Sequence, residues 1–378
     1  MWLVGWLACT PSPTDVVDRP TSTSDTGSTP TTPTAETGTP PEPCERPPVV
    51  AGDLHSAEAM ALCEAHEDLS LSGNLHLDGG GVVDLPCLCD LGGNLVIGDV
   101  SSVGLPRLRG TAGQILVDAS PALTVLELPA LTQVGRNLAV LDAPALTRLS
   151  APALAHIASD LRLERSPLLS TIELTALDRV GDTISLSDLP ALTTLDGLSA
   201  LRDVEWGLYV NGTGLVVASL PGLERMGGPL ALVGNASLER VEGFPRSREI
   251  AELRVNDAPH LTSIGGFAPD TWLWDLRLKD DPLLSALDLP AQTDIVGVVE
   301  LEHVPLLASA PHVSAVTDIF NVRLVDTGLV DLDDFEALER VLSNLVIVDN
   351  AQLPTLKAVA LAVRVDVGGT TTVRGNGP

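Results

Sequence analysis

The chain has 378 residues and a formal net charge of −28, and only 3% of its residues are aromatic although 44% are hydrophobic. Such acidity argues against nucleic acid as a partner, because that binding depends on cationic contacts with phosphate. It also argues against docking of a protein face on anionic lipid. No apolar run is long enough to span a bilayer, so membrane contact is not expected from the folded part of the chain.

Residues 1–9 form a short apolar segment that ends in Leu7-Ala8-Cys9. A signal peptide needs a cationic start, which is missing here, so we interpret the segment as the end of a signal whose true start lies upstream. It resembles a bacterial lipoprotein signal, which implies lipidation of Cys9, a cell-envelope location and membrane contact through a lipid anchor only. A simple secretory leader and a wrongly assigned start are the alternatives.

Residues 10–48 are dominated by Pro and Thr. Such a segment buries too little apolar surface to offset the entropy of ordering it. Pro-rich tracts of this kind act as semi-extended spacers or glycosylated stalks. We therefore predict a disordered stalk before a folded region that spans residues 49–378.

The remaining four cysteines lie at the start of the folded region: Cys44, Cys63, Cys87 and Cys89. An even number in an exported chain predicts two disulfides. A bridge within the Cys87-Leu88-Cys89 segment would be strained, which leaves two pairings. A metal site with the nearby His66 and His76 is a weaker alternative, because the spacing matches no usual zinc pattern.

A short amphipathic helix is predicted over residues 56–67, with Met60 and Cys63 on its apolar side. Together with the disulfides, this helix would form a cap over about residues 49–94, because a terminal repeat exposes its core unless something covers it.

A 23-residue repeat follows and fills most of the chain. Clear copies begin at Ile115, Leu138, Leu161, Ile184, Leu208, Leu230, Leu253, Leu276, Val299, Val322 and Leu345, and looser copies begin at Leu75, at Leu95 and near Val363. A fixed period of this length indicates a solenoid.

Within the copy that begins at Leu138, apolar residues occupy repeat positions 1, 3, 9, 12, 17 and 20: Leu138, Val140, Leu146, Leu149, Leu154 and Ile157. Alternation at the first two positions predicts a short strand, and the intervening Pro and Gly residues exclude a long helix. The fold predicted is mainly β, a right-handed parallel β-solenoid of about 13 coils.

This pattern resembles the receptor L-domain, a leucine-rich, β-helix-like module of receptor ectodomains and microbial surface proteins. The residues that carry the resemblance include 73–77, 93–97 and 180–186, and it covers about residues 44–367. It implies a surface location and a role in recognition. Receptor L-domains are shorter and come in pairs, which this chain does not reproduce. Ordinary leucine-rich repeats are the nearest rival, but they prefer Asn where this chain mostly has Asp.

Repeat position 5 carries a recurring carboxylate, at Asp142, Asp188, Asp257, Asp280, Asp326 and Asp349. Asp favours turns because its side chain bonds to nearby backbone N–H groups. Aligned carboxylates also suit calcium. We favour the turn and predict no metal or cofactor.

Repeat position 2 reads Arg254, Arg277, Glu300 and Arg323 in consecutive coils, and position 4 adds Lys279 and Glu302. A solvated ladder of ion pairs is the favoured interpretation. A basic stripe that meets an anionic partner is the alternative.

Aromatic residues are scarce, so their positions are informative. Trp206 and Trp274 occupy the same repeat position three coils apart, with Tyr209 and Trp272 close to them. These four aromatics, with Arg254 and Arg277, are the predicted ligand-binding residues, because aromatic and Arg side chains anchor binding surfaces. Burial at the coil corners is the competing interpretation.

No nucleophile elbow, P-loop or zinc-protease motif is present, so no catalytic residue is assigned. The sequence predicts a non-enzymatic, surface-displayed recognition module for an extracellular protein or glycan. A purely structural envelope protein and a β-solenoid enzyme acting on polysaccharide are the alternatives.

Overall fold

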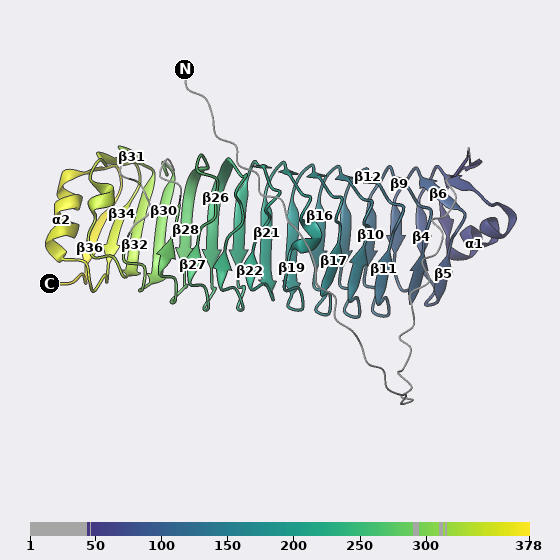
Figure 1. Ribbon diagram of the computed structural model, residues 1–378, viewed down its shortest axis with the longest axis horizontal. Coiled ribbons are helices and arrows are strands. Elements are labelled where there is room, and N and C mark those ends of the chain that lie inside the picture. Colours follow the sequence, from purple (N-terminus) through teal and green to yellow (C-terminus); the bar gives the residue numbers. More distant parts are fainter. Residues whose placement is uncertain (1–43, 46, 290–294, 310–312, 314–315) are drawn as a thin grey trace, which may run out of the picture. The chain divides into compact units, whose positions relative to one another are not determined.

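The computed structural model describes residues 44–45, 47–289, 295–309, 313 and 316–378. The predicted lipidation site at Cys9 and almost all of the predicted stalk lie outside these residues. The described part is a parallel β-solenoid of about 14 turns, one more than expected (Figure 1). None of its helices is both long and apolar enough to cross a membrane.

One continuous parallel sheet of 15 strands runs the length of the solenoid. Its strands, in spatial order, are β2 (Leu54–His55), β4 (Leu75–Leu77), β7 (Leu95–Ile97), β10 (Ile115–Asp118), β13 (Leu138–Leu141), β16 (Leu161–Glu164), β19 (Ile184–Leu189), β21 (Leu208–Thr213), β24 (Pro229–Val233), β26 (Glu249–Asn256), β28 (Trp272–Lys279), β30 (Val298–Val304), β32 (Asn321–Thr327), β34 (Leu345–Val348) and β36 (Thr371–Arg374).

The other sides of the coils form four shorter parallel sheets. The nine-stranded sheet contains β1 (Val49–Val50), β3 (Leu69–Leu71), β6 (Leu88–Leu91), β9 (Gly110–Thr111), β12 (Gln133–Val134), β15 (His156–Ile157), β18 (Arg179–Val180), β20 (Asp203–Val204) and β23 (Arg225–Met226). The five-stranded sheet contains β5 (Val82–Asp84), β8 (Ser102–Gly104), β11 (Val125–Glu127), β14 (Arg148–Ser150) and β17 (Thr171–Glu173). The four-stranded sheet contains β22 (Val217–Ala218), β25 (Arg240–Val241), β27 (Ser263–Ile264) and β29 (Ala286–Leu287), and the three-stranded sheet contains β31 (Asp318–Ile319), β33 (Arg340–Val341) and β35 (Asp366–Val367). Two single-turn 3₁₀ helices occupy Asp196–Leu198 and Asp333–Phe335.

The core confirms the repeat analysis. All six apolar residues singled out in the coil that begins at Leu138 are fully buried. Successive coils pair in register, as in Leu138 with Leu161 and Val140 with Leu163. The 23-residue step therefore places equivalent apolar side chains in stacked rows along one continuous core.

Repeat position 5 is a left-handed corner. The six Asp residues at this position have φ between 52° and 59°, and Arg165 and His303 have φ of 51° and 54°. Asp tolerates this conformation better than most residues, so the row of carboxylates is explained by the turn. Arg165 pairs with Asp142 at 2.7 Å, which offsets part of the stacked negative charge, and Nδ1 of His303 lies 2.6 Å from Oδ1 of Asp280.

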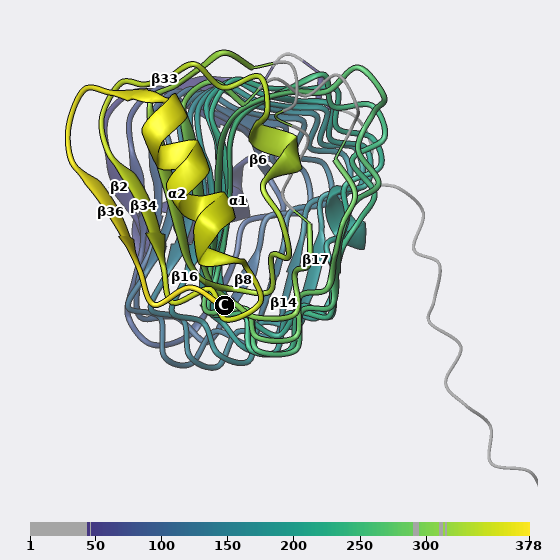
Figure 2. The same ribbon diagram turned by 90° about the vertical axis from the view of Figure 1, so that its left-hand side faces the viewer.

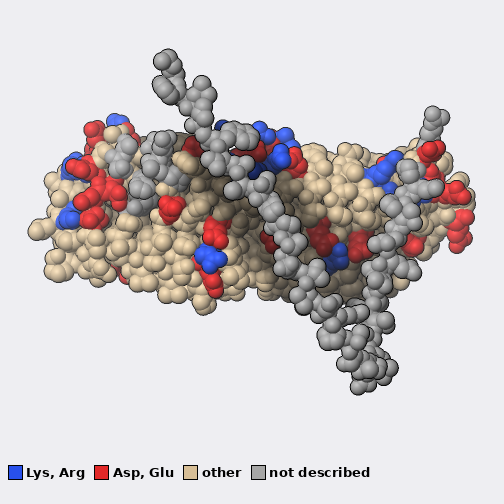
Figure 3. Space-filling view, in the orientation of Figure 1, with Lys and Arg blue, Asp and Glu red and all other residues tan. Residues whose placement is uncertain are grey.

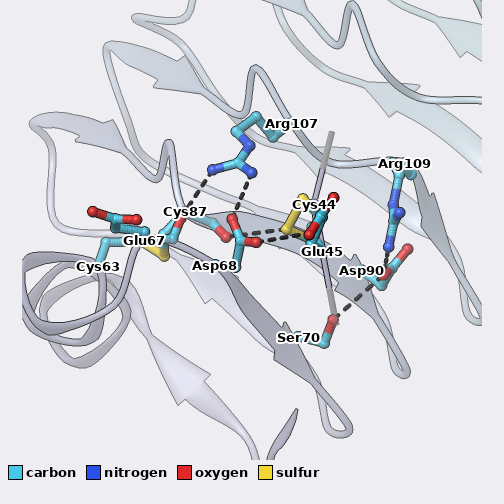
Figure 4. The surroundings of a disulfide bond; sticks show 11 residues. Cys44, Glu45, Cys63, Glu67, Asp68, Ser70, Cys87, Asp90, Arg107 and Arg109 are labelled. Atoms are coloured by element: carbon cyan, nitrogen blue, oxygen red, sulfur yellow. Dashed lines mark hydrogen bonds and ion pairs between the residues drawn. A yellow bond between two sulfur atoms is a disulfide. The ribbon is translucent and has the colours of Figure 1, made fainter. Parts of the chain in front are cut away.

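The N-terminal end contains the predicted helix, which ends two residues earlier than expected. Helix α1 spans Ser56–Ala65, and Met60 and Cys63 pack against the core. The disulfides are Cys44–Cys89 and Cys63–Cys87, one of the two expected pairings (Figure 4). Asp68 accepts a hydrogen bond from the Glu45 N–H at 3.0 Å and pairs with Arg107 at 2.5 Å.

The C-terminal end corrects the sequence analysis. The looser copy expected near Val363 is helix α2 (Thr355–Arg364), which lies across the end of the solenoid beside β34 and β36 (Figure 2). The last strand begins at Thr371, 26 residues after its partner Leu345. Ala358 and Leu361 are buried and close the core at this end, as α1 does at the other.

Candidate ligand-binding face

The regular stacking is interrupted after β23. The nine-stranded sheet ends there, and the following coils contain strands β26 and β28, each eight residues long. The change accompanies Phe244 and Phe267, whose rings stack at 5.9 Å. Phe244 occupies the corner position that Leu220 occupies in the preceding coil. The Leu220 N–H donates to the Gly243 carbonyl of the next coil, and the Phe244 N–H donates to the Gly266 carbonyl in the same way. The first half of β26 lies beside β23 but does not pair with it. The segment that would continue the nine-stranded sheet is therefore part of one long strand of the 15-stranded sheet.

Trp272 and Trp274 lie on the first half of β28 and are exposed, with 37% and 45% of their surface accessible. Their rings meet edge to face with centroids 5.4 Å apart. Leu273 between them is buried, so strand alternation turns both indoles outward. Burial at the coil corners is the stronger interpretation from the sequence, and the structure corrects this, because both side chains are exposed.

Trp274 belongs to a row of corner residues, one from each coil: Trp206, Gly228, Ala251, Trp274, Gly297 and Phe320. Backbone hydrogen bonds connect Ala251 to Gly228, Gly297 to Trp274 and Phe320 to Gly297, and Gly228 packs on the Trp206 carbonyl. Trp206 is 57% exposed and Phe320 is 53% exposed. We call Trp206, Trp272, Trp274 and Phe320 the aromatic strip.

Phe320 was not among the predicted site residues. The signal was present in the sequence, since Phe320 follows Trp274 by two full repeats at the same position. Among the described residues, these four are the aromatic side chains of Trp, Tyr and Phe that are exposed; Tyr209 and Phe267 are half-buried, and Phe244 and Phe335 are fully buried.

Gly297 provides space for the Trp274 ring. A Cβ atom at this glycine would clash first with Oδ1 of Asp275 and then with Cδ1 and Nε1 of the indole. The indole therefore lies against Gly297 of the next coil, in the direction of Phe320.

A network of ion pairs lies beside the strip on the 15-stranded sheet. Arg277 contacts Glu252 and Glu300 at 2.9 Å each and Asp275 at 3.4 Å. Arg254 contacts Glu252 at 2.7 Å. The position-2 ladder expected from the sequence is thus present, and both predicted Arg residues are paired within the protein.

Burial shapes the electrostatics of this network. Desolvation raises the pKa of Asp275, although the Val298 N–H donates to its Oδ1 at 2.8 Å and Arg277 lies close to it. Loss of the neighbouring arginine would therefore leave a half-buried carboxylate without its cation.

Tyr209 lies on the same outward face, but apart from the strip. It pairs in register with Ala231, which pairs with Arg254. The predicted residues therefore divide into two groups: the three tryptophans on the corner, and Tyr209 with the two arginines on the flat sheet.

The other flank of the strip is a hollow of about 550 Å³ at the open edge of β23. Its lining includes Arg225, Arg248 and Glu249. Arg225 pairs with Asp203 at 2.6 Å, and Glu249 lies beside Trp272 in the β26–β28 ladder. Both sides of the strip thus carry charged groups that donate and accept hydrogen bonds.

Among the described residues, one group has the spacing of a metal site: Cys44, Cys89 and Asp68. Its two sulfurs are joined as a disulfide and so are not free to ligate an ion.

No family model matches this chain, and the searches of curated proteins and of solved structures also gave no match.

Proposed function

We propose that this protein is a non-enzymatic recognition module displayed at the cell surface, and that its ligand docks on the aromatic strip. The observation that carries the proposal is the placement of all four exposed aromatic side chains of the described chain along one corner of the solenoid. Large exposed rings cost stability and solubility unless a partner covers them, and aromatic residues dominate the energy of binding surfaces.

Display at the surface is supported by the two disulfides, since these persist mainly in oxidising compartments. The lipoprotein-like start, the Pro/Thr stalk and the resemblance to receptor L-domains fit the same location. In this proposal Cys9 carries the anchor and the stalk holds the solenoid away from the membrane.

The test compares the full-length protein with a Trp206→Ala/Trp274→Ala/Phe320→Ala variant for binding of the labelled protein to intact cells and to isolated envelope polymers. The matched control is Leu168→Ala/Leu283→Ala/Leu306→Ala, which removes apolar side chains that are 54%, 43% and 52% exposed elsewhere on the solenoid. We expect the strip variant to lose most binding and the control to keep it.

Equal binding by all three proteins would contradict the proposal. If that result came with normal retention in the envelope, it would favour the purely structural role. Circular dichroism and thermal unfolding of each variant distinguish lost binding from lost folding.

A further inference from the structure

The aromatic strip runs parallel to the solenoid axis with a spacing set by the coils. Parallel strands lie about 4.8 Å apart, so Trp206 and Trp274 are roughly 14 Å apart along the axis, and Trp274 and Phe320 roughly 10 Å apart. A ligand that contacts all of the rings must be extended and long. A small molecule would reach at most one end of the strip.

Apart from the Trp272–Trp274 pair, the rings are separated from one another and do not form one apolar patch. Gly228 and Ala251 lie between Trp206 and Trp274, and Gly297 lies between Trp274 and Phe320. A protein interface usually has a contiguous dry centre surrounded by a polar rim. Here the rings form three separate platforms, namely Trp206, the Trp272–Trp274 pair and Phe320, and charged side chains border the strip on both sides.

Isolated rings flanked by polar groups match the two-sided chemistry of a sugar. A pyranose ring presents a face of C–H groups, which packs on the electron-rich face of an indole. Its edge carries hydroxyl groups that both donate and accept hydrogen bonds. Glu252, Asp275 and Arg277 border one side of the strip, and Arg248 and Glu249 border the other.

Charge restricts the ligand further. Four arginines that border the strip are paired with carboxylates, Arg254 and Arg277 with Glu252, Arg225 with Asp203 and Arg248 with Asp270, and the chain as a whole has a net charge of −28. A polyanion would meet repulsion from this acidic surface, which the paired arginines offset only in part. On the face drawn in Figure 3, Lys and Arg side chains gather most densely near the upper edge at mid-length, with carboxylates beside them, and further acidic groups lie along the rest of the face.

We infer that the aromatic strip binds an extended, uncharged polysaccharide whose chain runs parallel to the solenoid axis. Sugar rings stack on Trp206, on the Trp272–Trp274 pair and on Phe320, while hydroxyl groups bond to the flanking side chains. Each residue of an extended chain advances by roughly one coil spacing, so a periodic protein surface meets a periodic polymer. The inference rests on the proposed function and names its ligand class.

The experiment uses arrays of linear neutral oligosaccharides (glucans, mannans, xylans and galactans) from disaccharide to decasaccharide, with alginate and pectate fragments as acidic probes. We expect at least one neutral series to bind, with affinity rising about tenfold between a trisaccharide and a hexasaccharide as a second ring is engaged. Each Trp→Ala change at positions 206 and 274 should weaken the hexasaccharide about tenfold, and Leu168→Ala should leave it unchanged.

Three outcomes overturn the inference: no neutral series binds, only acidic fragments bind, or binding is unaffected by the Trp206→Ala and Trp274→Ala changes. If binding to cells depends on the aromatic strip but no neutral oligosaccharide on the array binds, the polysaccharide is rejected as the ligand while the proposed function stands. That combination would point to a protein ligand. A variant that fails to fold is replaced by Trp206→Leu or Trp274→Leu, and quenching of tryptophan fluorescence by the sugar gives an independent readout.

Discussion

The coils before β23 and the coils from β26 to β32 solve the same packing problem differently. The earlier coils keep the nine-stranded sheet and mostly place Leu at the corner. In the later coils that sheet has ended, β26 and β28 are each eight residues long, and three of the four strip residues, Trp272, Trp274 and Phe320, lie on the surface. In a solenoid, exposed aromatic side chains that could form a site occur mainly where the repeat is irregular, because identical coils would all carry the same residues.

The interior shows the same contrast at repeat position 6, which follows the left-handed corner. The earlier coils place Ser120 and Ser166 there, fully buried, whereas later coils place Asn235, Asp281 and Asn350. The Asn side chains bond fully: Asn235 Nδ2 donates to the Val210 carbonyl at 2.7 Å, and its Oδ1 accepts from the Thr213 N–H at 2.9 Å. Asp281 accepts from the Ala258 N–H at 2.9 Å, but its Oδ2 is buried without a partner.

The largest effects should come from the core. Leu163→Ala removes a fully buried side chain from a regular coil and should lower the free energy of unfolding by about 2–5 kcal/mol. Leu278→Ala is the equivalent change in β28 and should fall at the lower end, because its coil has more freedom to collapse around the cavity. Urea unfolding with hydrogen exchange of the local coil measures both. A larger loss of unfolding free energy for Leu278→Ala than for Leu163→Ala would contradict the view that the later coils are less tightly constrained.

Asp281→Asn should stabilise the protein at neutral pH. Burial, with Asp257 and Asp280 nearby, raises the pKa of Asp281 to about 8. A folded-state pKa above the unfolded value means that stability is fully present below about pH 4 and is lost as pH rises towards 8. The loss at pH 7 is on the order of 4 kcal/mol as an upper bound.

The Asn variant should remove this slope between pH 4 and pH 8 in thermal unfolding. The mirror change Asn235→Asp should introduce a slope of the same sign. If the Asp281→Asn variant unfolds with the same pH dependence as the unmodified protein, the buried Asp281 carboxyl does not cause the loss of stability between pH 4 and pH 8.

Gly297→Ala tests the seat of Trp274. Its Cβ would clash with the Asp275 carboxylate and with the Trp274 indole, so these side chains or the backbone must move, at a cost of about 1–3 kcal/mol. Tryptophan emission should change together with the melting temperature. Gly81→Ala is the control, since nothing lies within 4 Å of a Cβ there, and an equal response of the two variants would argue against the seat.

The smallest effect concerns the left-handed corners. Ala119 adopts φ 48° without the side-chain oxygen that helps Asp in this conformation, whereas Gly212 and Gly234 hold the same position in later coils. Ala119→Gly should therefore raise stability by roughly 0.5–1 kcal/mol, because relief of left-handed strain exceeds the entropic cost of glycine. Differential scanning calorimetry of the two proteins measures the change in melting temperature. A fall in melting temperature would show that the left-handed conformation of Ala119 is not the larger effect.

Much of the fold was predictable, because apolar spacing, turn residues and cysteine spacing are local signals repeated many times. Leu138, Leu154 and the α1 cap followed from them. Helix α2 did not, since its apolar residues continue the spacing expected of another coil near Val363. The merged strands β26 and β28 also escaped prediction, because they depend on how Phe244 and Phe267 pack between coils. At the site, Trp206 and Trp274 were identifiable from their shared repeat position, while exposure of the rings required the three-dimensional structure.

The Cys44–Cys89 disulfide also determines where mechanical load enters the protein. Tension applied through residues before Cys44 passes across the sulfur bridge to Cys89 in β6, so α1 and the strands β1 to β5 lie outside the direct load path. The second bridge, Cys63–Cys87, fastens α1 within this sheltered loop. Under tension between the two ends of the chain, the first coils are therefore covalently protected, and unravelling should begin at the end closed only by the packing of α2.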